Sequence, residues 1–239
     1  MSAGRKKFEI WTAISLALFL MFAVFFIYPI CTLLRQAFTT KEAAFTLDNF
    51  IKFFSKPYYY NTIFNSFKVS LAVMAVSLAI GIVMSYFYSF YELKGSKFIL
   101  VSSILCCMSA PFIGAYAWIL LLGRSGAMTL MLKALGIKVG SIYGFGGILL
   151  VQATKLYPLV MIYMNGMFAN LDNSLMEASS NLGCTGLRRF FSVVLRLSMP
   201  TILAAALLVF MRAFADFGTP ILIGEGYRTF TVEIYKQFL

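Results

Sequence analysis

The sequence contains no histidine among its 239 residues. This absence excludes Ser-His-Asp triads, zinc sites of the HExxH type and histidine-ligated haem in this chain. Acidic residues are also scarce, with nine Asp and Glu together, and they form no cluster in the sequence. Both shortages disfavour a membrane-embedded enzyme, although composition alone leaves serine or lysine chemistry open. We expect no catalytic residue, metal site or cofactor in this chain.

Charge of either sign is rare as well. Charged residues make up 12% of the chain, whereas a soluble domain has about 25%. Hydrophobic residues make up 61%, and the mean hydropathy is +0.85. The apolar runs are long and continuous instead of alternating with a period of two, which favours helices over a β-barrel. We therefore predict an all-α, polytopic helical membrane protein.

The four cysteines form no C-x-x-C pair, and we interpret them as small buried hydrophobes. The formal net charge of +11 would suggest nucleic acid as the partner of a soluble protein. Here the Lys and Arg residues lie in loops and at the ends of apolar runs, which indicates a membrane surface. We expect a lipid bilayer and no nucleic acid as the partner of these charges.

Apolar length predicts about five transmembrane helices, because about 20 residues cross a bilayer. The first follows Arg5, Lys6 and Lys7. It is too long for a signal peptide and lacks a small-residue cleavage site, so we expect an uncleaved span with a cytoplasmic N-terminus. The five predicted spans are Ile10–Leu34, Thr62–Phe90, Phe98–Leu122, Ile148–Phe168 and Thr201–Ile223.

The segments between the spans divide the chain. Residues 35–61 are mixed and aromatic, which is typical of an outer loop with interfacial pieces. We therefore separate an N-terminal unit, residues 1–61, from a core, residues 62–239. A glycine-rich outer segment, residues 123–147, is expected to contain a short surface helix around Met128–Leu135. Lys and Arg are almost equally numerous in the inner and outer loops, so the positive-inside rule does not decide the orientation.

Proline and glycine interrupt three of the predicted spans. Pro111 is expected to kink the third span, because proline removes a backbone donor and clashes with the preceding turn. Pro158 lies inside the fourth span, and Gly218 and Pro220 should break the fifth near its outer end. These positions predict bends, with packing or function as the reason.

Three ionisable residues fall within predicted spans, where charge is costly and points to function. Lys155 lies in the fourth span; it either serves the transport path or extends its amine to the interface. Arg212 and Asp216 lie four residues apart in the fifth span, so they share one helix face. Either they pair to lower the cost of burial, or their face lines a substrate path.

The longest polar interval between two spans is residues 171–200. Asp172, Asn173 and Ser174 are residues that start helices, and Ser174 with Glu177 fits the capping-box pattern. The first helix should end near Gly183, where glycine accepts a left-handed conformation.

A second helix should follow this glycine turn. Thr185 is its expected N-cap, and the helix should carry Arg188, Arg189 and Arg196 until Pro200. The interval therefore predicts a helix, a glycine turn and a second helix between two membrane spans.

This interval resembles a known motif. Glu177-Ala178-Ser179, with Gly183 six residues after the glutamate and a Leu-rich run to Pro200, is similar to the EAA loop of ABC importer permeases. Ser179 replaces the second alanine of the usual form, and Arg196 stands where a proline is common. The resemblance implies a cytoplasmic loop whose short helix docks in a groove of the ATPase subunit. The residues that it assigns to coupling are Glu177, Ala178, Ser179, Gly183, Arg188 and Arg189. Glu177 and Gly183 are also explained as capping residues, and both explanations are compatible.

Two further stretches, Pro111–Trp118 with Gly123–Gly126, and Asp216–Pro220, resemble the branch of this family that serves iron(III). Importers of polyamine, phosphonate or thiamine share much of the pattern. The resemblance covers residues 60–239 and implies a six-span unit in a bacterial inner membrane, of which a further span would follow Leu239. The implied partners are a dimer of ABC ATPase subunits, an extracytoplasmic substrate-binding protein and a second permease half, fused or separate. ATP and Mg²⁺ would belong to the ATPase, since no G-x-x-x-x-G-K-[ST] motif occurs here.

An ion channel or an ion-coupled secondary transporter is the alternative class. Lys155, Arg212 and Asp216 would then be gating or coupling charges. Such a protein needs no ATPase partner, and its loop around Glu177 would tolerate substitution.

Overall fold

The computed structural model describes residues 10–39, 45–91, 94–137 and 140–238. Regular structure in these residues is helical, apart from one isolated bridge between Thr39 and Phe45. The predicted all-α fold is therefore confirmed. The chain divides into two compact units, Met1–Tyr60 and Asn61–Leu239, which are described separately. The N-terminal cluster of Arg5, Lys6 and Lys7 lies outside the described residues.

The first unit is built on one long apolar helix. It consists of α1 (Ile10–Phe22), a π-helical turn η1 (Ala23–Ile27) and α2 (Tyr28–Phe38). Residues Trp11–Phe38 form an apolar helix of 28 residues, long enough to cross a membrane, so the predicted first span is confirmed. A short helix, α3 (Asp48–Ser55), follows within the predicted aromatic loop.

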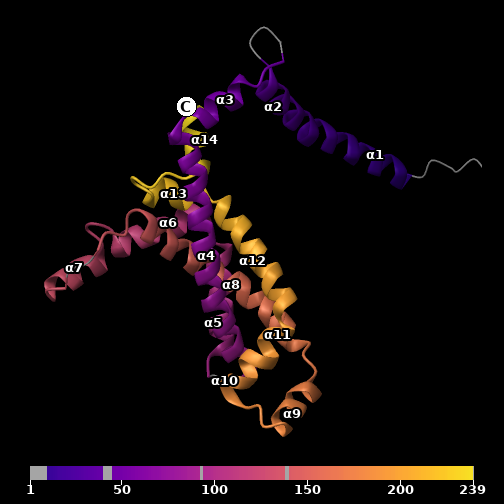
Figure 1. Ribbon diagram of the computed structural model, residues 1–239, viewed down its shortest axis with the longest axis vertical. Coiled ribbons are helices and arrows are strands. Elements are labelled where there is room, and N and C mark those ends of the chain that lie inside the picture. Colours follow the sequence, from indigo (N-terminus) through magenta and orange to yellow (C-terminus); the bar gives the residue numbers. More distant parts are fainter. Residues whose placement is uncertain (1–9, 40–44, 92–93, 138–139, 239) are drawn as a thin grey trace, which may run out of the picture. The chain divides into compact units, whose positions relative to one another are not determined.

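Two long helices dominate the second unit (Figure 1), which also contains shorter helices between and after them. α4 begins at the boundary of the first unit, and α8 lies at the centre of the second. The first part of this unit contains α4 (Pro57–Phe90), α5 (Ser96–Met108), α6 (Pro111–Leu122), α7 (Ala127–Ala134) and α8 (Phe145–Ala169). α4 and α8 confirm the predicted second and fourth spans, and α7 confirms the short helix expected near Met128.

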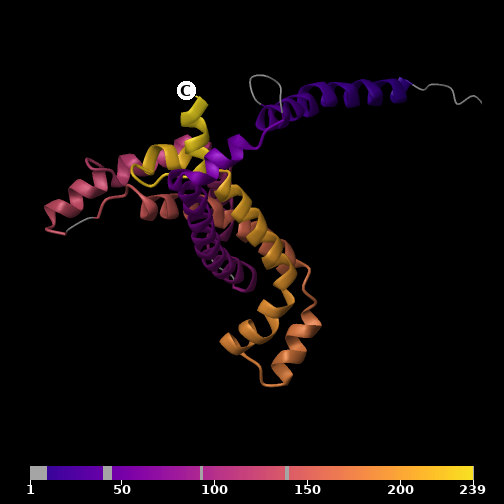
Figure 2. The same cartoon turned by 45° about the horizontal axis from the view of Figure 1, so that its top comes forward.

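The remainder of the unit contains shorter helices around one span. In chain order they are α9 (Asn173–Asn181), α10 (Gly186–Arg189), the π-helical turn η2 (Phe190–Val194), α11 (Leu195–Leu197), α12 (Met199–Phe214), α13 (Gly218–Ile223) and α14 (Phe230–Phe238). In Figures 1 and 2, α9 and α10 lie at one end of the unit, and α6, α7 and α13 lie at the other.

Four helices in the described residues are long and apolar enough to cross a membrane. The number rises to five if the segment Phe190–Leu197 and the helix Met199–Phe214, which are bent by 66° at Ser198, count as one span. The number agrees with the prediction of about five spans, but the third candidate is Pro111–Ala134, which combines α6 with α7, and not the predicted Phe98–Leu122. These helices qualify as spans by length and composition.

The predicted third span, Phe98–Leu122, is wrong, because the segment is divided between α5 and α6. Pro111 does not kink a continuous helix; it begins a new one, because Ser109 and Ala110 are extended. The residue before a proline is driven out of the helical region, and proline suits the first helical turn. α5 alone has 13 residues, which make about 20 Å of helix, less than the roughly 30 Å of a hydrocarbon core.

The predicted fifth span, Thr201–Ile223, is also divided. α12 ends at Phe214, and Gly218 begins α13 with Pro220 in its first turn. The break therefore lies before Gly218 instead of at Gly218 and Pro220. Proline is tolerated there because the first amides of a helix have no intrahelical acceptor. Pro158, in contrast, lies inside α8 as predicted.

The core of the second unit forms around α8. Val160 and Met164 are fully buried against apolar residues of α4 and α12, which include Val73 and Val209. A row of small residues lets α4 approach α8 closely, as small residues do in membrane helices. Its buried members in contact with α8 are Ser77, Gly81 and Ser85. A Cβ at Gly81 would lie 2.5 Å from the Val160 Cβ, so glycine is required at this contact.

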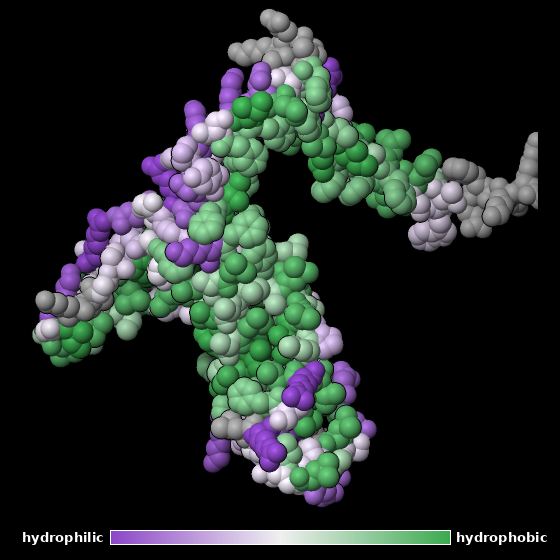
Figure 3. Space-filling model, viewed as in Figure 1, coloured by the Kyte–Doolittle hydropathy of each residue, from purple (hydrophilic) through white to green (hydrophobic). Residues whose placement is uncertain are grey.

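The outer surface of these helices is also apolar. Leu203, Leu207 and Met211 recur along one face of α12 and are 64%, 61% and 57% exposed. Figure 3 shows apolar side chains over the middle of this unit and hydrophilic ones at the end that carries α9 and α10. An apolar band between polar ends is the pattern of a membrane protein, which the sequence composition predicted.

Candidate functional site

The polar interval after α8 begins with a capped helix. Asp172 is the N-cap of α9, and its carboxylate accepts a hydrogen bond from the Ser174 amide at 2.9 Å. These hydrogen bonds from Ser174 lower the pKa of the Asp172 carboxyl below its usual value. The predicted capping box is therefore wrong, because Ser174 already lies inside the helix and Glu177 is beyond reach of the cap. Aspartate two residues earlier satisfies the first-turn amides instead.

The end of α9 matches the prediction. Gly183 has a φ of 74°, in the left-handed region that favours glycine. Its amide donates to the Ser180 carbonyl and the Cys184 amide donates to the Ser179 carbonyl, both at 2.9 Å. Together these bonds form the Schellman motif that terminates helices. A Cβ at Gly183 would meet nothing within 4 Å, so this corner of the loop faces open space.

The side chains predicted for coupling divide between the two sides of α9. Glu177 and Ala178 are exposed, whereas Ser179 is 7% exposed. Leu182, at the end of the helix, is 87% exposed beside Gly183. Leu182 is not predicted from the sequence, because a leucine at the end of a helix gives no signal by itself. The exposed side of α9 thus combines a carboxylate, a small residue and a leucine.

The second helix of the loop is tied to the first by an arginine. The Nη1 of Arg189 donates to the Ser180 Oγ at 3.0 Å, while its buried Nε has no partner in the described residues. Arg188, its neighbour, is exposed. The helix begins at Gly186, directly after the predicted cap Thr185. Of the two arginines, Arg189 therefore holds the loop together and Arg188 faces outward.

The same helical run packs onto the transmembrane core. Val194 is fully buried, and the Phe190 ring lies 4.7 Å from the Tyr86 ring of α4, centroid to centroid. Beyond them, the Ser198 hydroxyl contacts the Met167 sulfur of α8 at 3.1 Å, at the 66° bend before α12. The loop is thus connected to α4, α8 and α12 through packed side chains.

The charges predicted for the substrate path do not pair as one alternative expected. Arg212 and Asp216, which both lie in the described part of the chain, form no ion pair. Asp216 lies beyond the end of α12, so the four-residue helical spacing is lost. Its carboxylate instead accepts from the Gln152 side-chain amide at 2.9 Å and from the Gly218 amide at 3.2 Å.

Gln152 is the residue of this group that is not predicted from the sequence. It is 1% exposed in α8, and its Oε1 has no partner among the described residues. Lys155 lies one turn further along the same helix and is half-buried. A glutamine three residues before a lysine in an apolar helix was the available signal. α8 and the segment after α12 thus bring Gln152 and Asp216 together, and within the described ranges Lys155 and Arg212 form no ion pair.

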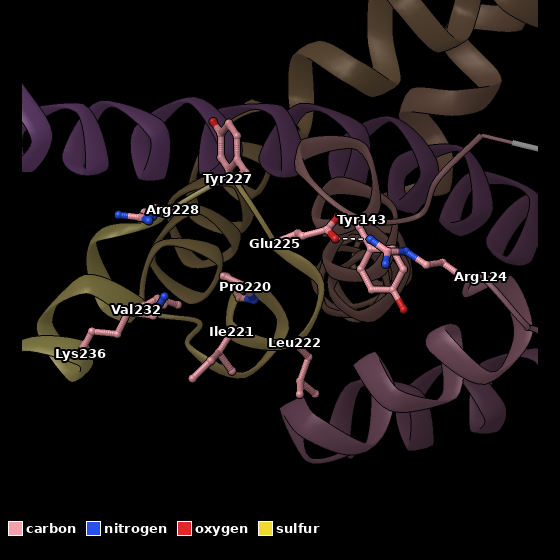
Figure 4. Close-up of a pocket in the computed structure, with 10 residues that line it drawn as sticks. All are labelled: Arg124, Tyr143, Pro220, Ile221, Leu222, Glu225, Tyr227, Arg228, Val232 and Lys236. Carbon is pink, nitrogen blue, oxygen red and sulfur yellow. Dashed lines mark hydrogen bonds and ion pairs between the residues drawn. The ribbon is translucent and has the colours of Figure 1, made fainter. Parts of the chain in front are cut away.

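A cavity of about 280 Å³ lies elsewhere, at the end of the unit near α13. None of the residues predicted to line a path borders it. Figure 4 shows Arg124 reaching Glu225, with which it forms an ion pair, while its guanidinium lies 5.2 Å from the Tyr143 ring centroid. The side chains of this pair are 73% and 53% exposed, and exposed pairs contribute only about 0.2–1 kcal/mol. Arg228 and Lys236 also border the cavity.

Comparison with known proteins places this geometry in a family. The family described as "Binding-protein-dependent transport system inner membrane component" matches residues 98–239, which include the loop around Glu177 and the charges of α8 and α12. The solved structure of a bacterial ABC transporter involved in alginate import is similar in fold. It is 19% identical, with a TM-score of 0.79 over 96% of this chain and 84% of that one.

Relatives of known sequence come from several transport systems. The ferric transport permease FbpB of Actinobacillus pleuropneumoniae is 27% identical over 231 residues, 96% of this chain. The spermidine/putrescine permease PotB of Haemophilus influenzae is 27% identical over 221 residues, 88% of this chain and 77% of PotB. PhnU of Salmonella paratyphi A, named for aminoethylphosphonate transport, is 25% identical over 91% of this chain and 77% of PhnU.

The chain covers 33% of FbpB, so it spans about a third of that relative's length. These relatives are named as transport permeases, not as enzymes. The family match extends over more than half of the chain and includes both the polar loop and the last described helices. The chain therefore belongs to the family of inner membrane components of binding-protein-dependent transport systems.

Proposed function

We propose that this chain is the permease of an ATP-driven ABC importer and that iron(III) is its substrate. It forms part of the substrate path in a bacterial inner membrane and hydrolyses nothing itself. An extracytoplasmic binding protein delivers the substrate, a dimer of ABC ATPase subunits supplies ATP and Mg²⁺ chemistry, and a second permease half completes the path. Family membership favours this class over the ion channel or secondary transporter considered from the sequence.

The observation that carries the proposal is the packed connection from the polar loop to the spans. The loop presents Glu177, Ala178 and Leu182 outward on a helix capped at both ends. The segment after it is buried against α4 and α8 through Phe190 and Val194. Because packed side chains transmit displacement instead of absorbing it, movement of α9 by a docked partner would reach the spans.

The mechanism that we propose is alternating access. ATP binding closes the ATPase dimer, and α9 moves with the groove in which it sits. The bend at Ser198 then rotates α12 relative to the loop, and the path changes from inward-facing to outward-facing. This mechanism requires that the polar loop and the N-terminus both lie on the cytoplasmic side of the membrane.

Iron(III) is proposed first because the stretches Pro111–Trp118 and Asp216–Pro220 resemble the iron branch, and FbpB is one of the relatives. Polyamine and phosphonate are the alternative substrates, since PotB is 27% and PhnU 25% identical to this chain. Thiamine has no support among the relatives described above. The permease need not ligate iron itself, because the binding protein supplies most of the selectivity.

The experiment is uptake of radiolabelled iron(III) by cells with and without the complete gene, repeated after ATP depletion. We expect deletion to remove an ATP-dependent iron component. Glu177→Ala should abolish uptake while the protein remains in the membrane. Lys133→Ala, which removes an exposed charge on α7, is the control and should leave uptake unchanged. Gene-dependent uptake that survives ATP depletion would contradict the ABC mechanism. If deletion of the gene removes phosphonate uptake and leaves iron uptake unchanged, phosphonate and not iron is the substrate.

Orientation is tested separately with Cys184, the half-buried cysteine directly after Gly183. A membrane-impermeant maleimide should label it in inverted vesicles and not in intact spheroplasts. Labelling from the outside would reverse the proposed topology and place the loop away from any cytoplasmic ATPase.

A further inference from the structure

Two cations on neighbouring helices of the second unit form no ion pair with an acidic residue that the structure describes. Lys155 is near the centre of α8, and Arg212 is in the last turn of α12. Neither forms an ion pair with an acidic residue in the described ranges. Charged residues inside membrane spans normally pair with one another or with backbone carbonyls, because isolated charge is costly there.

The register between α8 and α12 places these two cations at the same level along the two helices. The helices run antiparallel, with Gln152 hydrogen-bonded to Asp216 at one end and Met167 in contact with Ser198 at the other. Lys155 comes three residues after Gln152, and Arg212 comes four residues before Asp216. Lys155 is thus one turn from Gln152 in α8, and Arg212 lies in the last turn of α12, before the segment that carries Asp216; both cations are on the same side of the Gln152–Asp216 bond.

A cysteine of a third helix marks the same neighbourhood. The Cys106 thiol donates to the Thr154 carbonyl of α8 at 3.8 Å, which places its neighbour Cys107, near the end of α5, beside the part of α8 that carries Lys155. Cys107 is half-buried, Lys155 is half-buried and Arg212 is exposed, so the group is open on one side. The nearest acidic residue in sequence, Asp216, is already bonded to Gln152 and to the Gly218 amide. The formal charges of Lys155, Arg212 and Asp216 therefore sum to a positive value.

We propose that Lys155 and Arg212 form a cationic station on the transport path that selects a substrate carrying anionic oxygens. This deepens the proposed function and rests on it. Two adjacent positive charges repel each other, and an anion between them removes that repulsion while it gains two attractions. A phosphonate group and an iron(III) ion coordinated by anionic ligands both carry such oxygens. A polyamine, which is a polycation, is repelled at the same place.

Cys107 provides a test that does not require the substrate to be known. A variant of the complete transporter that keeps Cys107 as its one cysteine is expressed in cells. Its replacements include Cys31→Ser, Cys106→Ser and Cys184→Ser. Membranes are treated with anionic sulfonatoethyl methanethiosulfonate or with cationic trimethylammonioethyl methanethiosulfonate, and the two labelling rates at Cys107 are compared. The thiolate displaces methanesulfinate from either reagent, so the ratio of rates reports the local potential and cancels changes in the thiol itself.

We expect the ratio of anionic to cationic labelling to fall at least about tenfold in the Lys155→Gln/Arg212→Gln variant. Lys68→Gln with Lys133→Gln removes the same number of charges from α4 and α7 and should leave the ratio unchanged. An unchanged ratio in the Lys155→Gln/Arg212→Gln variant would overturn the proposal. Failure of both reagents to reach Cys107 would also overturn it, because the group would then not face an aqueous path.

Uptake distinguishes the two sources of anionic oxygen. Cells with the complete transporter are offered iron(III) citrate, aminoethylphosphonate or spermidine under ATP-replete conditions. We expect transport of one anionic species, reduced at least about tenfold in the Lys155→Gln/Arg212→Gln variant. Uptake of spermidine alone would overturn the proposal. Anion uptake that does not depend on ATP would instead contradict the ABC mechanism. The labelling ratio at Cys107 would still test the cationic station in that case.

Discussion

Gly218 and Pro111 lie against each other where α13 packs on α6: a Cβ at Gly218 would be 2.6 Å from the Pro111 Cβ. Both residues begin a helix after a break in a predicted span. The Phe112 and Phe217 rings meet beside them, with centroids 6.1 Å apart. Two interruptions that are 107 positions apart in the sequence thus form one contact, which holds the broken ends of two spans together.

The contact predicts that Gly218→Ala destabilises the second unit. An added methyl cannot fit against the rigid proline ring, and overpacking of this kind costs about 1–3 kcal/mol. The measurement is thermal unfolding of the detergent-solubilised protein. Gly114→Ala in α6 is the matched control, because a Cβ there would meet only the Ser109 hydroxyl at an ordinary 3.7 Å. Equal melting temperatures for the two variants would show that the contact is not tight.

The Gln152–Asp216 hydrogen bond predicts a coupling between the two residues. A hydrogen bond to a charged group contributes about 1.5–3 kcal/mol. We therefore expect Gln152→Leu and Asp216→Ala each to destabilise the protein, and the double variant to lose less than the sum of both. A double-mutant cycle of unfolding free energies measures the difference. Strictly additive effects would mean that α8 and α12 are not joined through this bond.

Gly183 predicts a separation of folding from coupling. Because a Cβ there meets nothing within 4 Å, Gly183→Ala should cost only the left-handed backbone penalty, about 1–2 kcal/mol. Gly183→Asp adds a charge at the outward corner beside Leu182, where we propose that the ATPase docks. We expect the Asp variant to remain in the membrane and to lose uptake while ATPase activity continues. Unchanged uptake in the Asp variant would remove the loop from the coupling mechanism.

Asp172 predicts a dependence of α9 on pH. Its pKa is lowered in the folded chain by the hydrogen bonds from Ser174. A lowered pKa means that the cap stabilises the helix above the unfolded value of about 3.9, and that this stability is lost as the pH falls through the folded value. Amide exchange at Ser174 in the solubilised protein should therefore lose protection on acidification below about pH 4.

The Asp172→Asn variant is the control for this prediction, because asparagine caps helices without titrating. Its protection at Ser174 should follow pH only through the intrinsic exchange rate. If both proteins behave identically across the acid range, the carboxylate of Asp172 is not the group that caps α9.

The sequence by itself determined the features that depend on composition and on residues within one or two turns. Long apolar runs predicted the helices that became α4 and α8, since the length of a span follows from the thickness of a bilayer. The end of α9 at Gly183 was also predictable, because the left-handed conformation is a property of that residue and its hydrogen bonds reach only a few positions back. The EAA-like spacing predicted the family for the same reason. The coupling role that it assigns to Glu177 stays a prediction.

Only the tertiary structure decided what the remaining polar and interrupting residues do. Arg212 and Asp216 were expected as neighbours on one helix, but the chain leaves α12 at Phe214 and Asp216 bonds to Gln152, 64 positions away. Pro111 was expected to bend a helix, and instead it begins one and packs on Gly218. Prolines, glycines and ionisable residues within an apolar run indicate that a helix is interrupted or that a charge is buried. The partner that satisfies the interruption or the charge is set by which helices pack together, and packing depends on the whole core at once.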